Sequence, residues 1–419
     1  MGKAFSLGFA AVTMGVIACL AAEGSEPRVL IIGIDGAGGR YVPAADTPNI
    51  DSLVANGAAR FDFYNEGGLV QDPPPGYGAS GVNWSTIVTG ASAEHHGVTD
   101  NSFAGSKFNS YPHFFKYIQE HDPTSYRASI VSWEPINSIV LADQFASLER
   151  EFPGLTSAQQ DALVRDTTVD LMRHGDPDAI FLHFDQVDAA GHGSGWGTPQ
   201  YNTALATVDG YIGNIMTAMN QRPGVVSGAE DWLVIVTADH GGLGLGHDAS
   251  QGPINWEVPF IVSGNSVADG TTLGRGTLRD VVPTALWHLG IDPFALGLDG
   301  TVRGLVVTPP NGILGDVNQD GLVTGDGRGP TESDDVSAFV AGWLSQGSGS
   351  IAERCARGDL NFDGITNLGD WAILNNASPA LGQAAFRRVI GVPEPASVVL
   401  LSFPVMWLTA HVRGGALRN

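Results

Sequence analysis

The chain has 419 residues, with 44 Asp and Glu against 21 Lys and Arg, which gives a formal charge of -23. A chain of this length can bury a large core, and we expect it to divide into two or more units. The acidic balance argues against nucleic-acid binding through a basic patch, because such a surface repels a phosphate backbone. It suits a protein that works with divalent cations, although a gain in solubility also explains part of the excess.

The first residues have the pattern of a secretion signal, which we place at residues 1–22. Lys3 gives a charged start, a largely apolar run follows, and two alanines offer small residues for cleavage. We therefore expect the protein to be exported to the cell envelope, the cell surface or the medium. Residues 16–19 also resemble a lipobox, so lipidation of Cys19 is an alternative. Cys355 is the only other cysteine, and we expect no intrachain disulfide.

Residues 27–307 alternate apolar runs with longer amphipathic stretches. Four continuous apolar runs are typical of buried strands, at 29–34, 179–184, 232–237 and 258–262. Three stretches have helical spacing, at 156–173, 201–219 and 280–289. This alternation predicts an α/β fold, with a mostly parallel central sheet and helices on both faces.

Metal-binding side chains follow the predicted strands. The carboxyl ends of parallel strands meet at one edge of a sheet, so we expect these side chains to converge. Asp and His are ligands of hydrolytic zinc sites, and two zinc ions about 4 Å apart can hold the attacking and leaving oxygens of an in-line displacement. The six candidate ligands are Asp35, Asp188, His192, Asp239, His240 and His247.

Ser80 is the candidate nucleophile. It lies in GASGVNWSTIVTG, which we interpret as a loop entering a helix, with Ser80 at or near the N-cap. Free backbone N–H groups, such as those near Gly81, and the helix dipole favour an anionic phosphate there. A serine hydroxyl is a weak nucleophile until a base or a metal removes its proton, so we expect Ser80 to be a metal ligand as well.

These residues resemble the alkaline phosphatase superfamily, and within it the type I phosphodiesterase/nucleotide pyrophosphatase branch, over roughly residues 28–307. IDG followed by TPNIDSLVANG matches the family's first metal aspartate, and Ser80 precedes Gly90 by the family's offset. The segment HHGVTDN is similar to the branch's motif whose final Asn contacts a phosphoryl oxygen, which makes Asn101 a candidate transition-state donor. The resemblance implies one zinc on Asp188, His192 and His247, and another on Asp35, Asp239 and His240 beside Ser80.

Two features depart from the diesterase pattern. Serine stands where the diesterases usually have threonine, and it is typical of the monoesterases and of the phosphoglycerate mutase relatives. His247 also follows His240 closely, as in sulfatases and other compact members, whereas the diesterases often place it much later. The sulfatase signature of Cys or Ser followed by x-Pro-x-Arg is absent, because Gly-Val-Asn-Trp follows Ser80. The substrate class therefore stays open between a phosphodiester and a phosphomonoester.

The composition changes near residue 308, where Gly and Asp become dense, and we place a separate module at 308–385. Two of its loops, rich in Asp and Asn, resemble dockerin repeats, whose oxygen ligands at alternate positions wrap Ca²⁺ as in an EF-hand, and the resemblance implies a small α-helical, calcium-binding module. In the first copy the stretch 325–333 intervenes, so it is either an interrupted loop that closes on Asp335 or a degenerate one. The resemblance implies a cohesin-like partner. The candidate ligands are Asp316, Asn318, Asp320, Asp335, Asp359, Asn361, Asp363, Asn367 and Asp370.

The end of the chain, residues 391–419, resembles a PEP-CTERM sorting signal. It consists of Val-Pro-Glu-Pro, an apolar run and a basic end. The apolar run is shorter than the roughly 20 residues that a membrane-spanning helix needs. We expect envelope sorting machinery to recognise this segment, which is also the only part of the mature chain that we expect to contact a membrane.

The sequence thus predicts an exported phosphoesterase with two Zn²⁺ in the domain at 27–307 and Ca²⁺ in the module that follows. The favoured substrate is a small phosphodiester or nucleotide pyrophosphate, cleaved through a phospho- or nucleotidyl-serine intermediate. Two alternatives stay open. One is a phosphomonoesterase of the alkaline phosphatase type, and the other is an inactive surface scaffold that acts through its dockerin-like module.

Overall fold

The computed structural model describes residues 25–142, 145–267, 270–305, 311–330, 333–346, 349–360, 362 and 365–390. The predicted signal at 1–22 with Cys19, the predicted sorting segment at 391–419, and the candidate calcium ligands Asn361 and Asp363 lie outside these residues. The chain divides into a larger unit that ends at Pro310, apart from two short later segments, and a smaller unit that begins at Asn311.

The larger unit is built on one eight-stranded sheet in the order β4-β3-β5-β1-β6-β7-β2-β8. Only β7 runs against the others, since it pairs antiparallel with both β6 and β2. This confirms the predicted α/β class with a mostly parallel sheet. The strands are β1 (Glu26–Ile34), β2 (Gly57–Tyr64), β3 (Arg127–Val131), β4 (Leu148–Arg150), β5 (Ala179–Phe184), β6 (Glu230–Thr237), β7 (Glu257–Ser263) and β8 (Thr271–Thr272).

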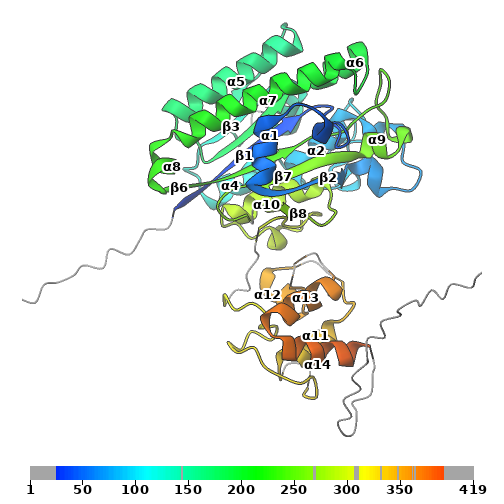
Figure 1. Ribbon diagram of the computed structural model, residues 1–419, viewed down its shortest axis with the longest axis vertical. Coiled ribbons are helices and arrows are strands. Elements are labelled where there is room, and N and C mark those ends of the chain that lie inside the picture. Colours follow the sequence, from blue (N-terminus) through cyan, green and yellow to red (C-terminus); the bar gives the residue numbers. More distant parts are fainter. Residues whose placement is uncertain are drawn as a thin grey trace, which may run out of the picture. The chain divides into compact units, whose positions relative to one another are not determined.

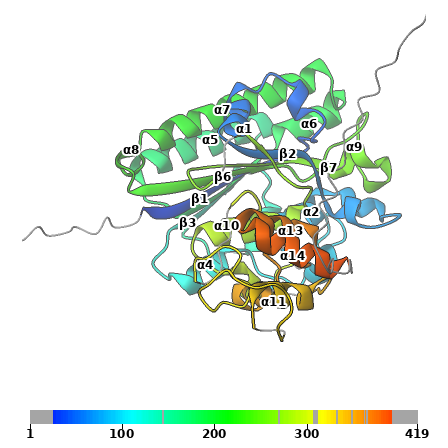
Figure 2. The ribbon, with the colours of Figure 1, turned by 60° about the horizontal axis from the view of Figure 1, so that its bottom comes forward.

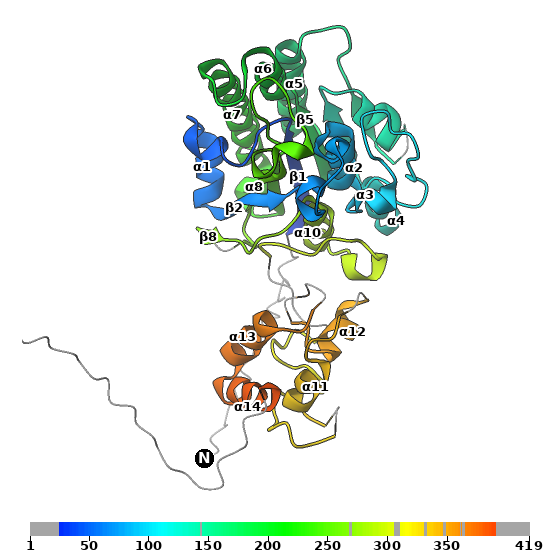
Figure 3. The same ribbon diagram turned by 90° about the vertical axis from the view of Figure 1, so that its right-hand side faces the viewer.

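Helices cover both faces of this sheet, as Figures 1 and 3 show. On one face α5 and α7 lie side by side, and on the other α2 and α10 pack together. None of the helices in the described part of the chain combines the length and apolar character that crossing a bilayer requires. The helices of this unit are α1 (Pro48–Ala55), α2 (Ser80–Thr89), α3 (Ala93–His96), α4 (Phe115–His121), α5 (Ser157–His174), α6 (Gln186–Ser194), α7 (Pro199–Asn220), α8 (Pro223–Ser227), α9 (Pro253–Trp256) and α10 (Val281–His288).

The central strand β1 shows why these apolar runs form strands. Its residues from Val29 to Ile34 are buried, because helices exclude water from both faces of the sheet. Gly33 interrupts the apolar run for a steric reason: a Cβ atom at this position would lie 2.4 Å from the ring of Trp84 on α2. Glycine at this point therefore allows the nucleophile-bearing helix to pack directly on the sheet.

The topology determines where chemistry can occur. Strands β5, β1 and β6 are parallel neighbours, and they end at Phe184, Ile34 and Thr237. Polar side chains that follow these strands are therefore delivered to one edge of the sheet, as is general for parallel sheets.

Four short helices lie in the described part of the chain after Asn311; α11, α13 and α14 belong to the smaller unit, whereas most of α12 is grouped with the larger one. Helices α13 and α14 pack against each other, and α14 also packs on α11, as can be followed in Figure 2. Cys355 is buried and forms no disulfide within the described residues, and its thiol donates a hydrogen bond to the Asp316 carbonyl. The helices are α11 (Asp335–Gly342), α12 (Ile351–Ala356), α13 (Leu368–Ala377) and α14 (Pro379–Val389).

Candidate functional site

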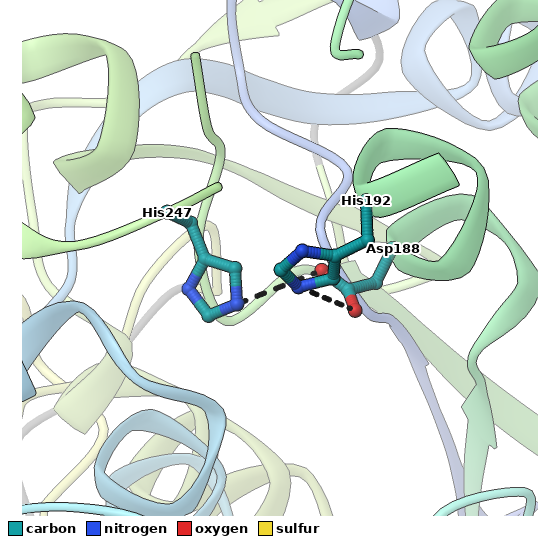
Figure 4. A group of neighbouring side chains, drawn as sticks. All are labelled: Asp188, His192 and His247. Carbon is teal, nitrogen blue, oxygen red and sulfur yellow. Dashed lines mark ion pairs between the residues drawn. The ribbon is translucent and has the colours of Figure 1, made fainter. Parts of the chain in front are cut away.

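The first group of predicted ligands lies at the carboxyl edge of the sheet. Asp188 and His192 are one turn apart on α6, which places both side chains on the same face of the helix. His192 Nε2 is 3.5 Å from Asp188 Oδ2, and His247 Nε2 is 3.8 Å from Asp188 Oδ1. Figure 4 shows the His192 imidazole beside the carboxylate on the same helix and the His247 imidazole pointing toward it from a separate segment. Together the three groups can hold one metal ion.

The second group lies deeper, directly after β1 and β6. His240 Nε2 is 3.5 Å from Asp35 Oδ1 and 3.2 Å from Asp239 Oδ2. All three residues are buried. The two groups are adjacent, because the His240 and His247 rings stack with their centroids 3.7 Å apart.

Backbone carbonyls determine which nitrogen of each imidazole carries its proton. A carbonyl oxygen only accepts, so each Nδ1 that contacts one must donate a proton to it. His192 Nδ1 donates to the Leu245 carbonyl at 2.9 Å, His240 Nδ1 to Gly241 at 3.1 Å, and His247 Nδ1 to Gly78 at 3.1 Å. Each neutral ring therefore presents a bare Nε2 lone pair to the carboxylates, the form in which histidine binds a metal.

Burial disfavours the ionised form of all three carboxylates, and repulsion from neighbouring carboxylates adds to it for Asp35 and Asp188. Burial, reinforced by Asp239 and Asp188, raises the pKa of Asp35 well above its ordinary value. Burial, with Asp239 and Asp185 nearby, raises the pKa of Asp188 to about 8. Burial raises the pKa of Asp239 to about 7, against hydrogen bonds that lower it. Like charges this close are unfavourable together unless a cation lies between them.

The donor set fits divalent metal ions. Each of the three carboxylates has one buried oxygen without a hydrogen-bond partner: Asp35 Oδ1, Asp188 Oδ1 and Asp239 Oδ2. An unpaired carboxylate oxygen in a buried site is costly, and here each lies near an imidazole nitrogen that carries no proton. Cations bound between these oxygens and nitrogens would give each oxygen a partner and would offset the repulsion between the carboxylates. Three oxygens and three nitrogens match the ligand types of catalytic zinc sites.

The predicted nucleophile lies beside this ligand cluster. Ser80 is the first residue of α2, one position beyond the N-cap Ala79, and its side chain is almost fully buried. Its Oγ is 3.2 Å from His240 Nε2. Because that nitrogen carries no proton, the hydroxyl donates. The hydroxyl is therefore held against the deeper metal group at the positive end of a helix.

Asn101 is at the other side of the nucleophile. Its Oδ1 accepts a hydrogen bond of 2.7 Å from the Gly81 backbone N–H. The backbone donor that the sequence suggested for a phosphoryl oxygen is therefore already bonded in this structure. The bond orients the amide of Asn101, an exposed residue.

Some residues that frame the site were not singled out from the sequence. The Gly36 carbonyl accepts hydrogen bonds from Trp196 Nε1 at 3.0 Å and Tyr201 Oη at 2.8 Å, while the Gly36 N–H donates to Asp239 Oδ1 at 3.1 Å. These bonds hold the turn after β1 against the other ligand segments. A tryptophan and a tyrosine distant in sequence carry no local signal for this role.

Two other groups of side chains lie close enough to hold a metal ion: Asp35, Asp188 and His240, in which Asp188 takes the place predicted for Asp239, and Asp35, His183 and Asp185. The hydrogen bonds of His183 argue against the group that contains it. Its Nδ1 accepts from the Trp133 backbone N–H at 3.3 Å, so Nε2 carries the proton and donates to Asp35 Oδ2 at 3.1 Å. Such an imidazole has no lone pair to offer a metal, and its pKa is lowered to about 3 by burial.

The two acidic loops of the smaller unit have matching hydrogen bonds. Asp335 accepts from the N–H groups of Val317 and Thr324, at 2.6 Å each. Asp370 accepts at 2.6 and 2.7 Å from the residues that occupy the same positions in the second loop, Leu360 and Asn367. The first loop therefore closes on Asp335 across the intervening stretch, which is the first of the two arrangements that the sequence left open.

The Asp316 carboxylate is also oriented by its loop. It accepts hydrogen bonds from the Gly321 N–H at 2.7 Å and the Asp320 N–H at 3.2 Å. Asn318 Nδ2 donates to Asp320 Oδ2 at 3.1 Å. These contacts bring together the candidate calcium ligands at the start of the first loop. In the second loop Asp359 is buried.

The raised carboxyl pKa values predict a pH-dependent stability of the metal-free protein. Unfolded carboxyls titrate near pH 4, whereas Asp188 and Asp239 keep their protons to about pH 8 and about pH 7. The folded state binds more protons over this interval, so its free energy of unfolding falls as pH rises. His240 and His247, whose pKa values burial lowers, act in the opposite direction only below about pH 6.5. We expect the melting temperature of chelator-treated protein to fall between pH 6.5 and 8.5, and less steeply in Asp188→Asn. A flat profile would contradict the expectation.

Comparison with known proteins agrees with this geometry. The sequence model of the family described as type I phosphodiesterase / nucleotide pyrophosphatase matches residues 29–159 and 124–260. Among curated proteins, the 2,3-bisphosphoglycerate-independent phosphoglycerate mutase of Halobacterium salinarum is 34% identical over 141 residues, which is 31% of this chain and 24% of the mutase. An uncharacterized pyrophosphatase/phosphodiesterase of Schizosaccharomyces pombe is 28% identical over 216 residues, 47% of this chain and 42% of that protein. The chain thus matches less than half the length of either relative.

Among solved structures, a putative sulfatase from Bacteroides thetaiotaomicron has a TM-score of 0.51 with 14% sequence identity, over 66% of this chain and 74% of that one. This likeness concerns the fold alone. The family match, by contrast, spans more than half of the chain and contains Ser80 and all six candidate ligands. On that match, this protein belongs to the type I phosphodiesterase/nucleotide pyrophosphatase family.

Proposed function

We propose that this protein is an exported, zinc-dependent phosphoesterase that cleaves phosphodiester or nucleotide pyrophosphate bonds through a covalent intermediate on Ser80. The observation that carries the proposal is the placement of the buried Ser80 hydroxyl, 3.2 Å from His240 Nε2, beside three imidazoles and three carboxylates that each keep one oxygen without a hydrogen bond. Family membership supports the same chemistry.

The metal centre would have two parts. Asp188, His192 and His247 would hold one zinc ion, and Asp35, Asp239 and His240 the other. When bound, the ions would supply Lewis acidity that lowers the pKa of the nucleophile and offsets charge on the attacking and leaving oxygens.

The residues of the chain would carry the remaining steps. Ser80 Oγ, held at the start of α2, would form the bond to phosphorus as the bond to the leaving-group oxygen breaks. The Asn101 amide, oriented by Gly81, would donate to an equatorial phosphoryl oxygen as charge develops. Water would then cleave the phosphoserine or nucleotidyl-serine, release the acid product and restore the hydroxyl.

The electrostatics favour a diester over a monoester. Among the described residues, the ion-pair contacts of Asp35, Asp188 and Asp239 are with histidines, and neither Arg nor Lys contributes. A monoester brings a second negative charge, which gains from an extra cationic side chain at the site. The alternative, a phosphomonoesterase, is favoured by the serine nucleophile and by the similarity to phosphoglycerate mutases.

Replacing the nucleophile tests the mechanism. We expect Ser80→Ala to lower turnover of bis-p-nitrophenyl phosphate by at least about 10³-fold, since the residual rate would come from the metals and binding alone. Zinc content, measured by atomic emission, should stay at the wild-type value, because six other ligands remain. Ser85→Ala is the control: this buried serine of the same helix donates its hydroxyl to the Gly81 carbonyl and does not face the ligands. Full activity in Ser80→Ala would exclude the covalent mechanism.

Comparing two chromogenic esters tests the substrate class. We expect a higher kcat/KM for bis-p-nitrophenyl phosphate than for p-nitrophenyl phosphate, because the diester carries one negative charge fewer into a site without Arg or Lys. The wild-type protein should be measured with both esters at the same zinc concentration. A preference for the monoester would favour the phosphomonoesterase instead.

For the smaller unit we propose a calcium-binding role, with a cohesin-like protein as its partner. The matched hydrogen bonds of Asp335 and Asp370 support two loops of the same design. Oxygen-rich loops of this kind suit a hard cation. Export, and sorting through residues 391–419, remain part of the proposal on sequence grounds. A scaffold with an inactive catalytic unit would use the same module but does not explain six retained ligands.

Calcium titration of the whole protein tests this role. We expect two Ca²⁺ per chain in the wild type and one in either Asp335→Asn or Asp370→Asn, because each change weakens the residue that closes one loop. Asp326→Asn is the matched control, since Asp326 lies in the stretch that interrupts the first loop and is not a candidate ligand. Isothermal titration calorimetry gives the stoichiometry. A wild type that binds no Ca²⁺ would exclude the role.

A further inference from the structure

Two ring N–H groups converge on one oxygen of the metal ligand Asp35. Trp84 Nε1 donates to Asp35 Oδ2 at 3.0 Å, and His183 Nε2 donates to the same atom at 3.1 Å. All three side chains are buried, with Trp84 and His183 fully inaccessible. The other oxygen of the carboxylate, Oδ1, has no hydrogen-bond partner and lies 3.5 Å from His240 Nε2. One oxygen of this carboxylate therefore accepts two hydrogen bonds, and the other accepts none.

This asymmetry recurs in the second aspartate of the deeper group. Asp239 Oδ1 accepts from the backbone N–H groups of Gly36 and His240, at 3.1 and 2.9 Å, whereas Oδ2 is bare. For Asp239, the donors to the hydrogen-bonded oxygen are backbone N–H groups. For Asp35 they are two side chains, which mutation can remove one at a time.

The position of Trp84 follows from the helix and the sheet together. It is four residues after Ser80 on α2, so the two side chains lie on the same face of the helix. Gly33 is the next-to-last residue of β1 and Asp35 directly follows the strand, so the two are two residues apart and face the same side of the sheet. The Trp84 ring fills the space over Gly33 and reaches Asp35, since a Cβ at Gly33 would lie 2.4 Å from it.

His183 completes the arrangement from the neighbouring strand. It pairs with Gly33 in the β1–β5 register, and its ring packs edge-on against Trp84 with centroids 4.7 Å apart. The Trp133 backbone N–H bonds to His183 Nδ1, which keeps the proton on Nε2. The His183 ring can therefore only donate a hydrogen bond to Asp35.

We propose that Trp84 and His183 are positioning residues that hold Asp35 as a single-oxygen ligand and set the affinity of the deeper metal site. The inference rests on the proposed metal centre. With Oδ2 saturated by two donors, only Oδ1 is available to an ion, and its direction is fixed toward His240. Without them the carboxylate could rotate in its pocket, and an ion would have to order it on binding. Outer hydrogen bonds of this kind are worth roughly 10–100-fold in metal affinity.

The same contact couples the nucleophile to the metal. Because Trp84 and Ser80 belong to one helical turn, the bond from Trp84 to Asp35 fixes the distance between the helix start and the ligand after β1. Ser80 Oγ and Asp35 Oδ1 then meet at a common neighbour, His240 Nε2, at 3.2 and 3.5 Å.

Metal affinity of full-length variants tests the proposal without relying on activity. In Trp84→Phe the ring remains aromatic but loses its N–H. Trp232→Phe is the matched control, because Trp232 is also buried and donates its indole N–H to a carboxylate, Glu230, at the opposite end of β6. Zinc would be titrated against a chromophoric chelator, which reports both ions separately. We expect Trp84→Phe to weaken one of the two ions by about 10–100-fold and to leave the other unchanged, with wild-type values for Trp232→Phe.

A pair of substitutions at His183 supplies the second arm. His183→Leu removes the donor at similar volume and should weaken the same ion, whereas His183→Gln retains an N–H within reach of Asp35 and should restore most of the affinity. Wild-type affinities in both Trp84→Phe and His183→Leu would overturn the positioning role and leave the metal centre intact. A wild-type protein that binds no zinc at all would instead overturn the metal centre, and the inference with it.

Discussion

Three carboxylates buried at the edge where β5, β1 and β6 end are the constraint on which the catalytic unit depends. Burial raises the pKa values of Asp35, Asp188 and Asp239, repulsion from neighbouring carboxylates adds to this for Asp35 and Asp188, and each of the three keeps one oxygen without a hydrogen bond. A fold tolerates such a cluster when a compensating charge is supplied from outside the chain. Bound divalent cations would supply it, and the same charge would then be available to a phosphate ester. The same three carboxylates thus destabilise the metal-free fold and would bind the cations that act in catalysis.

Hydrogen bonds with the surrounding chain orient five of the six candidate ligands. Backbone carbonyls take the Nδ1 proton of each ligand histidine, and backbone or ring N–H groups take one oxygen of Asp35 and of Asp239. What is left faces inward: three lone pairs on nitrogen and three on oxygen. Preorganisation of this kind reduces the reordering that metal and substrate binding would otherwise require. The tight turn at Gly36, held by Trp196 and Tyr201, extends the same support to the backbone.

Much of the fold could be predicted from the sequence because its strands are buried on both faces. The predicted strand at 179–184 coincides with β5, and the helices predicted at 156–173 and 201–219 match α5 and α7 to within about two residues at each end. The continuous apolar character of such runs is a strong local signal. Strands β2 and β3 were missed, because GAARFDFY and RASIV mix polar with apolar residues. The run at 258–262 was recognised as a strand, but its antiparallel direction as β7 depends on its partners and has no local signature.

By itself, the sequence determined which seven side chains belong to the predicted site and that most of them follow strand ends. It also determined the α/β alternation and the acidic loops that come after it. Local spacing suffices for these, since a ligand one turn from another, or next to a strand end, is specified by neighbours in the chain. The tertiary structure alone decided which atoms are bare and which are bonded. The tautomers of the histidines, the saturated oxygen of Asp35 and the closure of the first acidic loop on Asp335 depend on hydrogen bonds between segments far apart in sequence. Such bonds form only when the sheet has brought those segments within about 3 Å of each other.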